Sequence, residues 1–185
     1  MKVSREQAAK NRERILKMAA RLFRERGYDG IGVADLMKSA GLTHGGFYGQ
    51  FTSKEDLLEQ ATEQVLKENA RNRLKMIRSG DDAWESFKQG YLSPIHRDKP
   101  GHSCAMTTLA IEAPRRALGI RRVLTQGLQA LIDDLTRILP QKHRHDPREQ
   151  ALTALSTLVG AVVLSRAVDN PELADEILEA VKGNL

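Results

Sequence analysis

Apolar residues recur at the spacing of an α-helix along most of this chain. Over residues 5–26, Ile15, Ala19, Leu22 and Phe23 fall on one stripe at i, i+4, i+7 and i+8. This spacing puts them on a single face of a helix, as in an amphipathic helix that packs against a core. No segment sustains the apolar–polar alternation of a strand. The pattern therefore predicts an all-α fold.

A shorter apolar stripe covers residues 33–40, and a segment of unusual composition follows it. Residues 41–51 read GLTHGGFYGQF, in which three glycines fall within five residues beside three aromatic rings. We expect Thr43 to cap a very short helix that runs through Phe47 and Tyr48. Two helices joined by so short a turn form a helix-turn-helix, whose second helix enters the major groove of DNA.

The composition of this second helix suits a close approach to DNA. Gly45 and Gly46 carry no side chain that would hold the backbone away from phosphates or base edges, although each glycine costs about 1 kcal/mol of helix stability. Phe47 and Phe51 are four residues apart, so we expect both rings to face the core. Tyr48 then points elsewhere, and its hydroxyl can donate to a phosphate oxygen. A glycine-rich loop between two helices is the alternative.

Helical patterns also fill the rest of the chain. Ser53 and Asp56 form a capping-box pattern ahead of a helix that is expected to end near residue 78. Of about nine helices in all, those expected farther on begin near Asp82, cover CAMTTLAIEA at 104–113, run from Pro114 to Leu139, cover 148–168 and run from Asn170 to about Val181, with a loop over 93–101.

Charge is distributed unevenly along the chain. The net charge is +5, and residues 1–55 hold eleven lysines and arginines against six acidic residues, whereas residues 56–185 hold eighteen of each. A basic part joined to a neutral part suggests a polyanion-binding module followed by a module with another task; a solvated basic helix face is the alternative. We therefore predict a helix-turn-helix DNA-binding domain over residues 1–55 and a helical ligand-binding and dimerisation domain over residues 56–185.

The overall composition is that of an ordinary globular protein, with 41% hydrophobic and 29% charged residues. The polar and basic start is unlike a secretory signal. The longest strongly apolar run, LVGAVVL at residues 158–164, is too short to cross a bilayer. A single cysteine, Cys104, excludes an internal disulfide framework. We expect a cytoplasmic protein without a membrane partner.

The run ILKMAARLFRERGYDGIGVADLMKSAGLTHGGFYGQFTSKEDLL, over residues 15–58, resembles the DNA-binding domain of the TetR/AcrR family of transcriptional regulators. The resemblance rests on an apolar first helix, a Gly-Tyr pair, an Ala-Gly turn and a closing F-Y-x-x-F-x-[ST]-K-E-x-L. Two departures are visible: Gly32 stands where the family usually has a capping threonine or serine, and the first alanine of the A-x-x-A-G turn is replaced while Ala40-Gly41 is kept. The resemblance implies a homodimer, a double-stranded DNA operator with two half-sites, and a small-molecule effector bound by the second domain.

Roles in DNA binding are carried over by position within this match. His44 lies in the recognition helix and is the expected base-reading side chain, with a solvent-exposed turn residue as the alternative. Lys54 lies at the start of the fourth helix, where a helix N-terminus favours phosphate. Lys2, Arg5 and Lys10 precede or open the first helix and can reach phosphate or the minor groove. The full set expected to contact DNA is Lys2, Arg5, Thr43, His44, Gly45, Gly46, Tyr48 and Lys54.

The helix over residues 148–168 is apolar on almost every face, and such a helix is buried on every face. A chain of this size cannot bury all of it alone, so we expect it to pair with the same helix of a second copy. The resemblance implies the same, a four-helix interface built from the last two long helices. A central core helix of a monomer is the alternative. The expected interface residues are Leu152, Leu155, Val159, Val162, Val163 and Ile177.

An effector pocket is expected among the helices of the second domain, since pockets between helices are mostly apolar with few polar groups. Plain core is the alternative for each residue taken singly. The candidate lining residues are Trp84, Phe87, Tyr91, Cys104, Met106 and Leu109.

Cys104 follows His102 at the expected N-terminus of the helix over residues 104–113. That position would favour the thiolate through the helix dipole, and many relatives also have a cysteine eight residues before a glutamate, as Cys104 precedes Glu112. Three interpretations remain open: a small buried core residue, a sensor of electrophiles or oxidants, and a metal ligand with His102 and His96, whose spacing is not diagnostic. No bound metal or cofactor is expected.

Enzymatic function has little support in the sequence. A cysteine–histidine pair could act as a nucleophile, but no nucleophile elbow, glycine-rich phosphate loop or carboxylate pair accompanies it. The sequence predicts a ligand-responsive DNA-binding regulator, a repressor released from a palindromic operator by a small molecule or an electrophile. The alternatives are a thiol-sensing repressor that acts through Cys104 and a non-enzymatic architectural DNA-binding protein.

Overall fold

The computed structural model describes residues 4–78, 82–140 and 146–185. These ranges contain eight α-helices and four short 3₁₀ turns, and no strand, so the all-α prediction is confirmed. The α-helices are α1 (Arg5–Arg26), α2 (Val33–Ser39), α3 (Lys54–Arg78), α4 (Ala83–Tyr91), α5 (Pro94–Asp98), α6 (Leu118–Ile138), α7 (Pro147–Ala167) and α8 (Pro171–Asn184). The 3₁₀ turns are η1 (His44–Gly46), η2 (Pro100–His102), η3 (Ala105–Thr107) and η4 (Ala113–Arg115).

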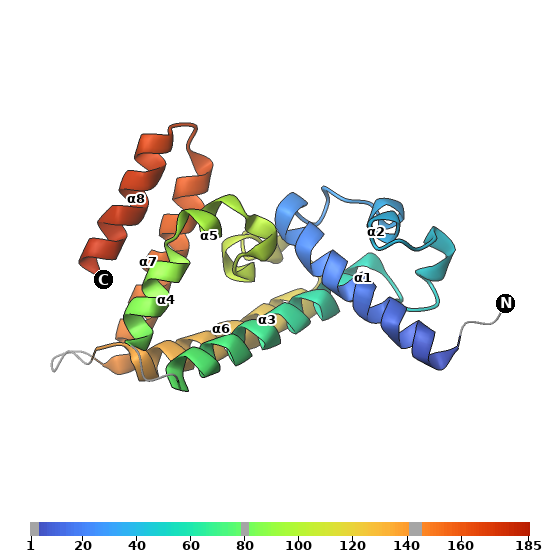
Figure 1. Cartoon of the computed structure of the whole chain (residues 1–185), viewed down its shortest axis with the longest axis horizontal. Coiled ribbons are helices and arrows are strands. Elements are labelled where there is room, and N and C mark those ends of the chain that lie inside the picture. Colours follow the sequence, from blue (N-terminus) through green and yellow to red (C-terminus); the bar gives the residue numbers. More distant parts are fainter. Residues whose placement is uncertain (1–3, 79–81, 141–145) are drawn as a thin grey trace.

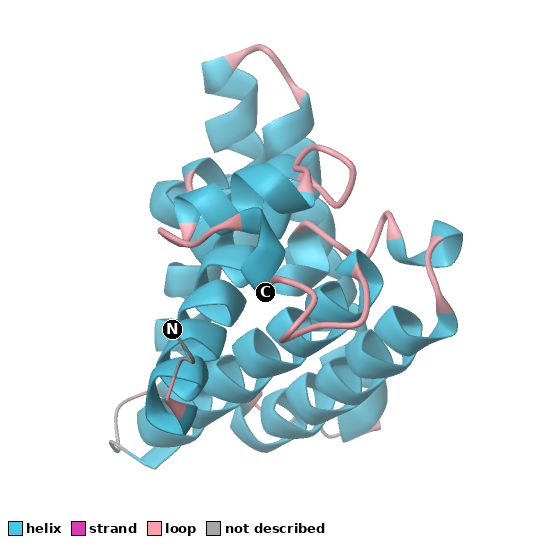
Figure 2. Ribbon diagram, turned by 90° about the vertical axis from the view of Figure 1, so that its right-hand side faces the viewer, coloured by secondary structure: helices cyan, strands magenta, loops and turns pink. Residues whose placement is uncertain are grey.

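The molecule is elongated (Figure 1). Helices α1 and α2 lie at the end that carries the N-terminus, and α7 and α8 lie at the opposite end with the C-terminus. Helices α3 and α6 pack side by side along the long axis and connect the two ends. Figure 2 shows the molecule turned by 90°, with helices joined by loops and no strand among the described residues. Events at one end can therefore reach the other through two rigid helices.

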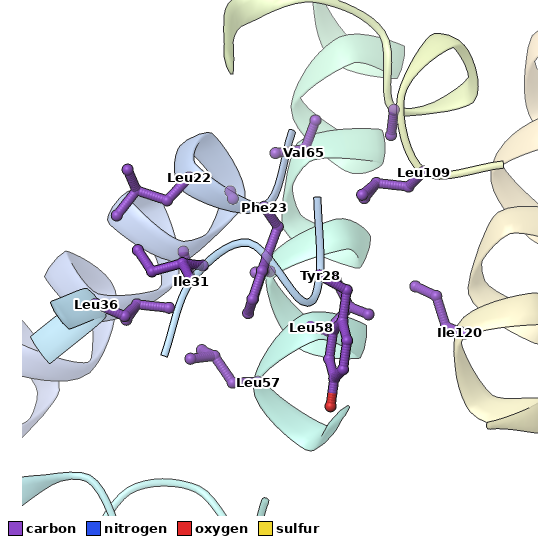
Figure 3. Packing of buried hydrophobic residues seen from close by; sticks show 14 of the residues in the cluster. Leu22, Phe23, Tyr28, Ile31, Leu36, Leu57, Leu58, Val65, Leu109 and Ile120 are labelled. Carbon is purple, nitrogen blue, oxygen red and sulfur yellow. The ribbon is translucent and has the colours of Figure 1, made fainter. Parts of the chain in front are cut away.

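The buried residues form two hydrophobic clusters. The first contains α1, α2 and the first half of α3, and Figure 3 shows Phe23 and Tyr28 within it. Leu109 and Ile120, which come from beyond α4, belong to this same cluster. The second cluster contains residues of α4, α6, α7 and α8. The expected division after residue 55 falls inside α3, so the first core crosses it.

The start of α3 follows the capping prediction with one difference. The Ser53 hydroxyl accepts a hydrogen bond from the Asp56 backbone N–H at 3.0 Å, as an N-cap residue does. The Asp56 carboxylate accepts from the backbone N–H of Thr52 at 2.9 Å. In a capping box it would accept from Ser53 instead. The backbone N–H of Thr52 lowers the pKa of Asp56, which keeps this cap ionised.

The prediction of a helix over residues 104–113 is wrong. The segment forms the separate turns η3 and η4. The Thr107 hydroxyl donates to the carbonyl oxygen of Cys104 at 2.9 Å, and the Thr108 hydroxyl donates to that of Ala105 at 3.3 Å. Threonine side chains that bond to the nearby backbone compete with helix formation, and Pro114 prevents a helix from continuing through residues 113–115.

The predicted loop over residues 93–101 contains a short helix, α5. Ser93 accepts a hydrogen bond from the backbone N–H of His96 at 3.1 Å and so caps the helix. Pro94 follows at the first helical position, where proline is favoured because its fixed φ suits a helix and its missing N–H is not needed. The Ser93-Pro94 pair is therefore a helix start signal, which the prediction of a loop did not recognise.

Helix α7 matches the predicted range of 148–168 to within one residue. It is the helix in the described ranges whose length and mean hydropathy would suit a membrane span. A buried core helix passes the same test, and seven residues of α7 are buried within this chain. Its Arg166 side chain donates to the carbonyl oxygens of His96 at 2.6 Å, Arg97 at 2.8 Å and Thr107 at 3.1 Å. One guanidinium thus fixes the connection between α4 and α6 against α7.

Candidate DNA-contacting segment and effector cavity

The turn after α2 is built as the helix-turn-helix prediction requires. Gly41 has a φ of 68°, in the left-handed region that favours glycine. The backbone N–H of Leu42 donates to the carbonyl oxygen of Met37 at 2.9 Å, which closes the end of α2. At the other end of α2, Gly32 provides no side-chain cap, in keeping with the departure noted in the sequence.

The predicted helix through Phe47 and Tyr48 is wrong in length. The structure has a single 3₁₀ turn, η1, and the Thr43 side chain does not cap it. Three glycines in five residues cost about 1 kcal/mol each in a helix, so the helix does not extend. A further turn follows, in which the backbone N–H of Phe51 donates to the carbonyl oxygen of Phe47 at 3.0 Å.

The two sides of this segment differ sharply. Phe47 and Phe51 are buried at 1% and 2% exposure, with ring centroids 5.7 Å apart, as predicted. Tyr48 is 68% exposed, and its ring meets the edge of Phe47 at 5.2 Å and that of His44 at 5.8 Å. Thr43, His44, Gly45 and Gly46 are exposed beside it. We call residues 43–48 the recognition segment.

The glycines of the recognition segment are not required by its own packing. A Cβ atom added to Gly45 would meet no atom of the described residues within 4 Å, and one added to Gly46 would make ordinary contact with Met37 at 3.7 Å. Neither glycine has positive φ. The absence of side chains here is therefore not explained by the interior of the protein, and it leaves the backbone open to an outside partner.

The lysines and arginines expected to contact DNA differ in their surroundings. Arg5 is exposed at the start of α1. Lys54 is half-buried, with its ammonium 4.2 Å from the centroid of the Tyr28 ring, and burial lowers the pKa of Lys54. Lys10 pairs with Glu6 at 2.6 Å. Lys2 lies outside the described residues.

The end of α1 packs against the segment over residues 100–116 at a junction that the sequence analysis missed. Gly27 has a φ of 73°, and a Cβ atom there would lie 2.5 Å from the Glu112 carboxylate. That carboxylate accepts a hydrogen bond from the backbone N–H of Tyr28 at 3.1 Å. Glycine is thus needed at position 27 both for its backbone conformation and for its close neighbour.

Two cations lie over the Tyr28 ring at this junction. The Arg116 guanidinium is 4.3 Å from the ring centroid, and Lys54 approaches the same ring. Arg116 also pairs with Asp29. Burial, followed by a hydrogen bond with Glu55, raises the pKa of Tyr28 above its ordinary value. The phenol therefore stays neutral between charged partners, and it connects the two parts of the chain.

Arg24 makes a second connection between these parts. Its guanidinium donates to the carbonyl oxygens of Ser103 at 2.7 Å and Ala20 at 2.8 Å. Burial lowers the pKa of Arg24, although an arginine remains charged in any case. Nearby, the side chain of Glu25 packs against Gly101. The last two turns of α1 therefore contact the segment that begins at η2.

On the far side of that segment lies a cavity of about 260 Å³. Its wall comes from four parts of the chain. Helix α3 contributes Asn69, Asn72, Arg73 and Met76; α4 contributes Ser86, Phe87, Gly90 and Tyr91; the connection contributes His96, His102, Ser103 and Cys104; and α6 contributes Leu131. Ser103 belongs to this wall, and its carbonyl oxygen also accepts the hydrogen bond of Arg24. The same backbone segment therefore borders the cavity and contacts α1.

Of the six residues expected to line an effector pocket, three line this cavity and three do not. Phe87, Tyr91 and Cys104 line the cavity. Trp84 is buried in the second hydrophobic cluster, and Met106 and Leu109 are buried in the first. Met106 and Leu109 were placed on a helix that does not form, which is why they face another side.

Two polar groups of the cavity wall are buried. The Tyr91 hydroxyl has no nitrogen or oxygen hydrogen-bond partner among the residues that the structure describes, and its polar neighbour is the Cys104 thiol. Burial, followed by the neighbouring Cys104, raises the pKa of Tyr91 well above its ordinary value. The Arg73 Nε donates to Asp134 at 2.9 Å, with side-chain exposures of 12% and 8%. This ion pair joins α3 to α6 at the cavity.

His96 holds the backbone around Cys104. Its Nδ1 lies 2.7 Å from the carbonyl oxygen of Tyr91, and its Nε2 accepts a hydrogen bond from the backbone N–H of Cys104 at 2.9 Å. Nε2 must therefore carry a lone pair, so the ring is neutral and donates through Nδ1. Burial lowers the pKa of His96 to about 4.

Part of the structural surroundings expected to make the Cys104 thiol reactive is absent. Cys104 precedes a three-residue 3₁₀ turn, not the N-terminus of a helix, so the helix-dipole argument is wrong. The described part of the chain contains no group of three or more histidine, cysteine, aspartate or glutamate residues placed to hold an ion, so the metal interpretation gains no support there. Cys104 is a half-buried thiol in the cavity wall.

The residues expected at a dimer interface divide into two sets. Leu155 and Val162 are buried in the second cluster of their own chain, so their assignment to an interface is corrected. Leu152 is exposed, and Val159, Val163 and Ile177 are half-buried. The prediction missed two exposed leucines at the same end of the molecule, Leu164 on α7 and Leu173 on α8, with exposures of 58% and 41%. Helix periodicity alone did not say which apolar face was already covered.

Comparison with known proteins places these features in context. Residues 15–61 match the family model described as bacterial regulatory proteins, tetR family. The chain is 37% identical over 60 residues to the HTH-type transcriptional repressor KstR2 of Mycolicibacterium smegmatis, a match that covers 32% of this chain and 29% of that protein. It is 22% identical over 182 residues to the HTH-type transcriptional repressor NemR of Escherichia coli, covering 92% of each.

Solved structures agree in fold along nearly the whole chain. The reduced form of Escherichia coli NemR superposes with a TM-score of 0.83 at 22% identity, covering 95% of this chain and 94% of that one. A TetR-family transcriptional regulator from Agrobacterium tumefaciens superposes with a TM-score of 0.81 at 19% identity, covering 96% and 98%.

Proposed function

We propose, from the premise that this chain is a member of the TetR/AcrR family of transcriptional regulators, that it is a homodimeric repressor whose operator binding is relieved by a ligand in the cavity beside α3 and α4. Regulators of this family bind DNA operators, typically as dimers with small-molecule effectors. The remaining task is to assign these activities to residues of this chain.

The recognition segment is the proposed contact with DNA, and the observation that carries this proposal is its outward-facing backbone. Gly45 has open space around it, and Tyr48 is exposed above the buried Phe47. The buried ring of Phe47 therefore holds the segment to the core, and the backbone at Gly45 is open on the outer side. His44 is the proposed base-reading residue, and the Tyr48 hydroxyl is the proposed phosphate donor.

Helices α7 and α8 are the proposed dimer interface. Leu152, Leu164 and Leu173 are exposed apolar side chains on these two helices, and pairing with a second copy would remove them from water. A two-fold dimer presents two recognition segments, so the operator is expected to be nearly palindromic, with half-sites about 34 Å apart or a multiple of that distance.

Relief of repression is proposed to pass through the connection that lines the cavity. Ser103 is part of the cavity wall, and its carbonyl oxygen accepts from Arg24 near the end of α1. A ligand that displaces this backbone would shift α1 and the recognition segment that packs on it. The ligand acts only if it binds the DNA-incompetent arrangement more tightly, because only differential affinity shifts a population.

Thiol modification is the second candidate for the signal, since Cys104 lines the same cavity. An adduct on Cys104 would fill part of the cavity and press on the same connection. Overpacking of a core site costs about 1–3 kcal/mol, which is also the size of typical allosteric couplings. The alkylation rate of Cys104, with operator affinity before and after modification, tests this candidate. Full induction of a Cys104→Ser variant would argue against it.

A DNA-selection experiment tests the main proposal. The full chain is mixed with a random duplex pool, and bound sequences are amplified and read. We expect a near-palindrome, and we expect its affinity to fall steeply with salt because phosphate contacts release counterions. A flat salt response, or recovery of sequences without two-fold symmetry, would contradict the proposal. The regulator itself is proposed to act in the cytoplasm, where its operator is.

A further inference from the structure

The cavity wall combines hydrogen-bond donors with a complete lack of carboxylates. Within the part of the chain that the structure describes, no aspartate or glutamate lines it, whereas Arg73, Asn69, Asn72 and Tyr91 do. A site of this composition favours a ligand that accepts hydrogen bonds. The inference below rests on the proposed function, in which this cavity is the effector site.

The Tyr91 hydroxyl is the first group that points to such a ligand. It is buried, and no nitrogen or oxygen atom of the described residues provides it with a hydrogen-bond partner, so the Cys104 thiol is its polar neighbour. Buried polar groups are nearly always paired, so a hydroxyl with only a weak thiol partner calls for an explanation. Arg73, Tyr91 and Cys104 all line the cavity.

The Arg73 guanidinium is the second group. It is nearly buried, and Nε is the donor that Asp134 uses. Its other N–H groups have no acceptor within residues 4–78, 82–140 and 146–185. Asp134 lies in addition 3.7 Å from Arg137, so two cations share this one carboxylate. The planar edge of an arginine matches a carboxylate, which accepts from it in pairs.

The rest of the wall combines apolar side chains with serine and histidine residues, and the cavity is small. Met76, Phe87 and Leu131 line it from three helices, and the rings of Phe87 and Tyr91 lie 5.4 Å apart. The volume of about 260 Å³ is near the lower end of ligand cavities, which span about 300–1,000 Å³. One aromatic ring with a short substituent fits such a space, whereas a polycyclic or long-chain ligand does not.

We propose that the cavity binds a single-ring aromatic carboxylate, whose carboxylate accepts hydrogen bonds from Arg73 and Tyr91 and whose ring packs between Phe87 and Met76. The ligand completes the hydrogen bonding that the protein leaves open. Neutral molecules of the same shape bind less well, because they do not provide the charge that Arg73 matches.

Calorimetric titration of the full chain with three acids and their amides tests this proposal. The acids are benzoate, 4-hydroxybenzoate and cinnamate, and each primary amide is the matched neutral control. We expect at least one acid to bind with a Kd below roughly 1 mM, and its amide to bind at least about tenfold more weakly, as expected when a charged hydrogen bond is lost. The proposal is overturned if no acid binds in this range, or if acid and amide bind alike.

Two variants identify the groups responsible. Tyr91→Phe should weaken acid binding about tenfold while leaving the melting temperature of the free protein unchanged or higher, because it removes an unpaired buried hydroxyl. Tyr28→Phe, at a buried tyrosine outside the cavity, should leave acid binding unchanged. Arg73→Lys keeps a cation beside Asp134 but removes the planar edge, so it should shrink the preference for acid over amide. Unchanged acid binding in Tyr91→Phe would overturn the proposal.

Operator binding is measured separately, so that the two proposals can fail independently. If the acids bind and Tyr91→Phe weakens them, but operator affinity does not change, the ligand class stands and the mechanism of release fails. If operator binding responds to neutral ligands alone, the repressor proposal stands and the ligand class fails.

Discussion

The recognition segment and the junction around Tyr28 belong to the same hydrophobic cluster, but they use glycine in opposite ways. In the junction, Gly27 has positive φ and lies against Glu112, so the interior of the protein demands it. In the recognition segment, Gly45 has ordinary φ and empty space around it. A glycine that the fold does not need is a better indication of an outside partner than one that the fold requires.

The comparison extends to charge. At the junction, buried or half-buried charges have partners in the same chain, as Arg24 has Ser103 and Arg116 has Asp29, although the Arg116 Nε has no hydrogen-bond partner among the described residues. Around the recognition segment, His44 and Tyr48 are exposed. Substitutions at the junction and in the connection should therefore change the stability of the protein. Substitutions in the recognition segment should change DNA binding instead.

Acidification should produce the largest loss of stability, through the mostly buried ring of His96. The folded protein lowers the pKa of His96 to about 4 from an ordinary value of 6.5, so protons bind the unfolded chain more readily. Stability that is fully present above about pH 6.5 should be lost as the pH falls through about 4, by up to about 3 kcal/mol. Urea unfolding of the full chain at a series of pH values measures this loss.

The control for acidification is His96→Gln, which can still accept from the backbone N–H of Cys104 but does not titrate. It should be less stable than the wild type at neutral pH and should lose less stability between about pH 6.5 and pH 4. Carboxylates elsewhere titrate in both proteins alike. If the two proteins lose stability in parallel, His96 does not have the assigned role.

Gly27→Ala should be the next largest effect. The backbone at this position has φ 73° and ψ 172°, a region used almost only by glycine, and a side chain there costs about 1–3 kcal/mol. The new Cβ atom also displaces Glu112 from the backbone of Tyr28. Thermal unfolding should show the loss. Gly45→Ala, with open space and ordinary φ, is the matched control and should not lower stability; a loss equal to that of Gly27→Ala would remove the distinction.

His44→Ala should leave folding unchanged and act on DNA alone. Loss of a base contact costs about 1–3 kcal/mol at one position of the half-site. The preference at that position should relax, whereas Tyr48→Phe should weaken all sequences to the same degree. Binding to a set of operator variants by mobility shift separates these results. A uniform loss for His44→Ala would make it a phosphate contact instead.

Gly32→Ser should give the smallest effect and the opposite sign. The N-cap position of α2 has extended backbone, no side-chain cap and open space for a Cβ atom. A serine there can accept from the first turn of α2 and should stabilise the protein by a few tenths of a kcal/mol. Chemical denaturation measures the gain, and a loss of stability would show that Gly32 serves another purpose.

The hydrophobic pattern predicted those elements whose faces differ clearly in polarity. Helices α1, α2 and α3 follow from apolar spacing, and the burial of Phe47 and Phe51 follows from their four-residue separation. Helix α7 was predicted from its apolar composition instead. Residues 104–113 were predicted as helix because propensity favours it. The Thr107 and Thr108 hydroxyls donate to the local backbone instead. Such bonds depend on side-chain orientation, which the hydrophobic pattern does not contain.

The cavity shows a different limit of sequence analysis. Phe87 and Tyr91 were predicted because they are aromatic residues on one face of the expected helix. Arg73 lies on a polar stretch of α3 that resembles any solvated helix face, and its partner Asp134 is 61 residues away along the chain. A buried ion pair of this kind leaves no local trace in the sequence, and neither does the contact between Gly27 and Glu112.

The bonds made by Arg166 have a consequence for how this protein can change over generations. They go to carbonyl oxygens of His96, Arg97 and Thr107, which every amino acid possesses. Arg166 therefore holds part of the connection through groups that do not depend on its side chains, beside the His96 ring and the Thr107 hydroxyl, which also take part. A substitution at another position of the connection leaves these carbonyl acceptors in place, so this part of the frame can persist while the neighbouring surface changes.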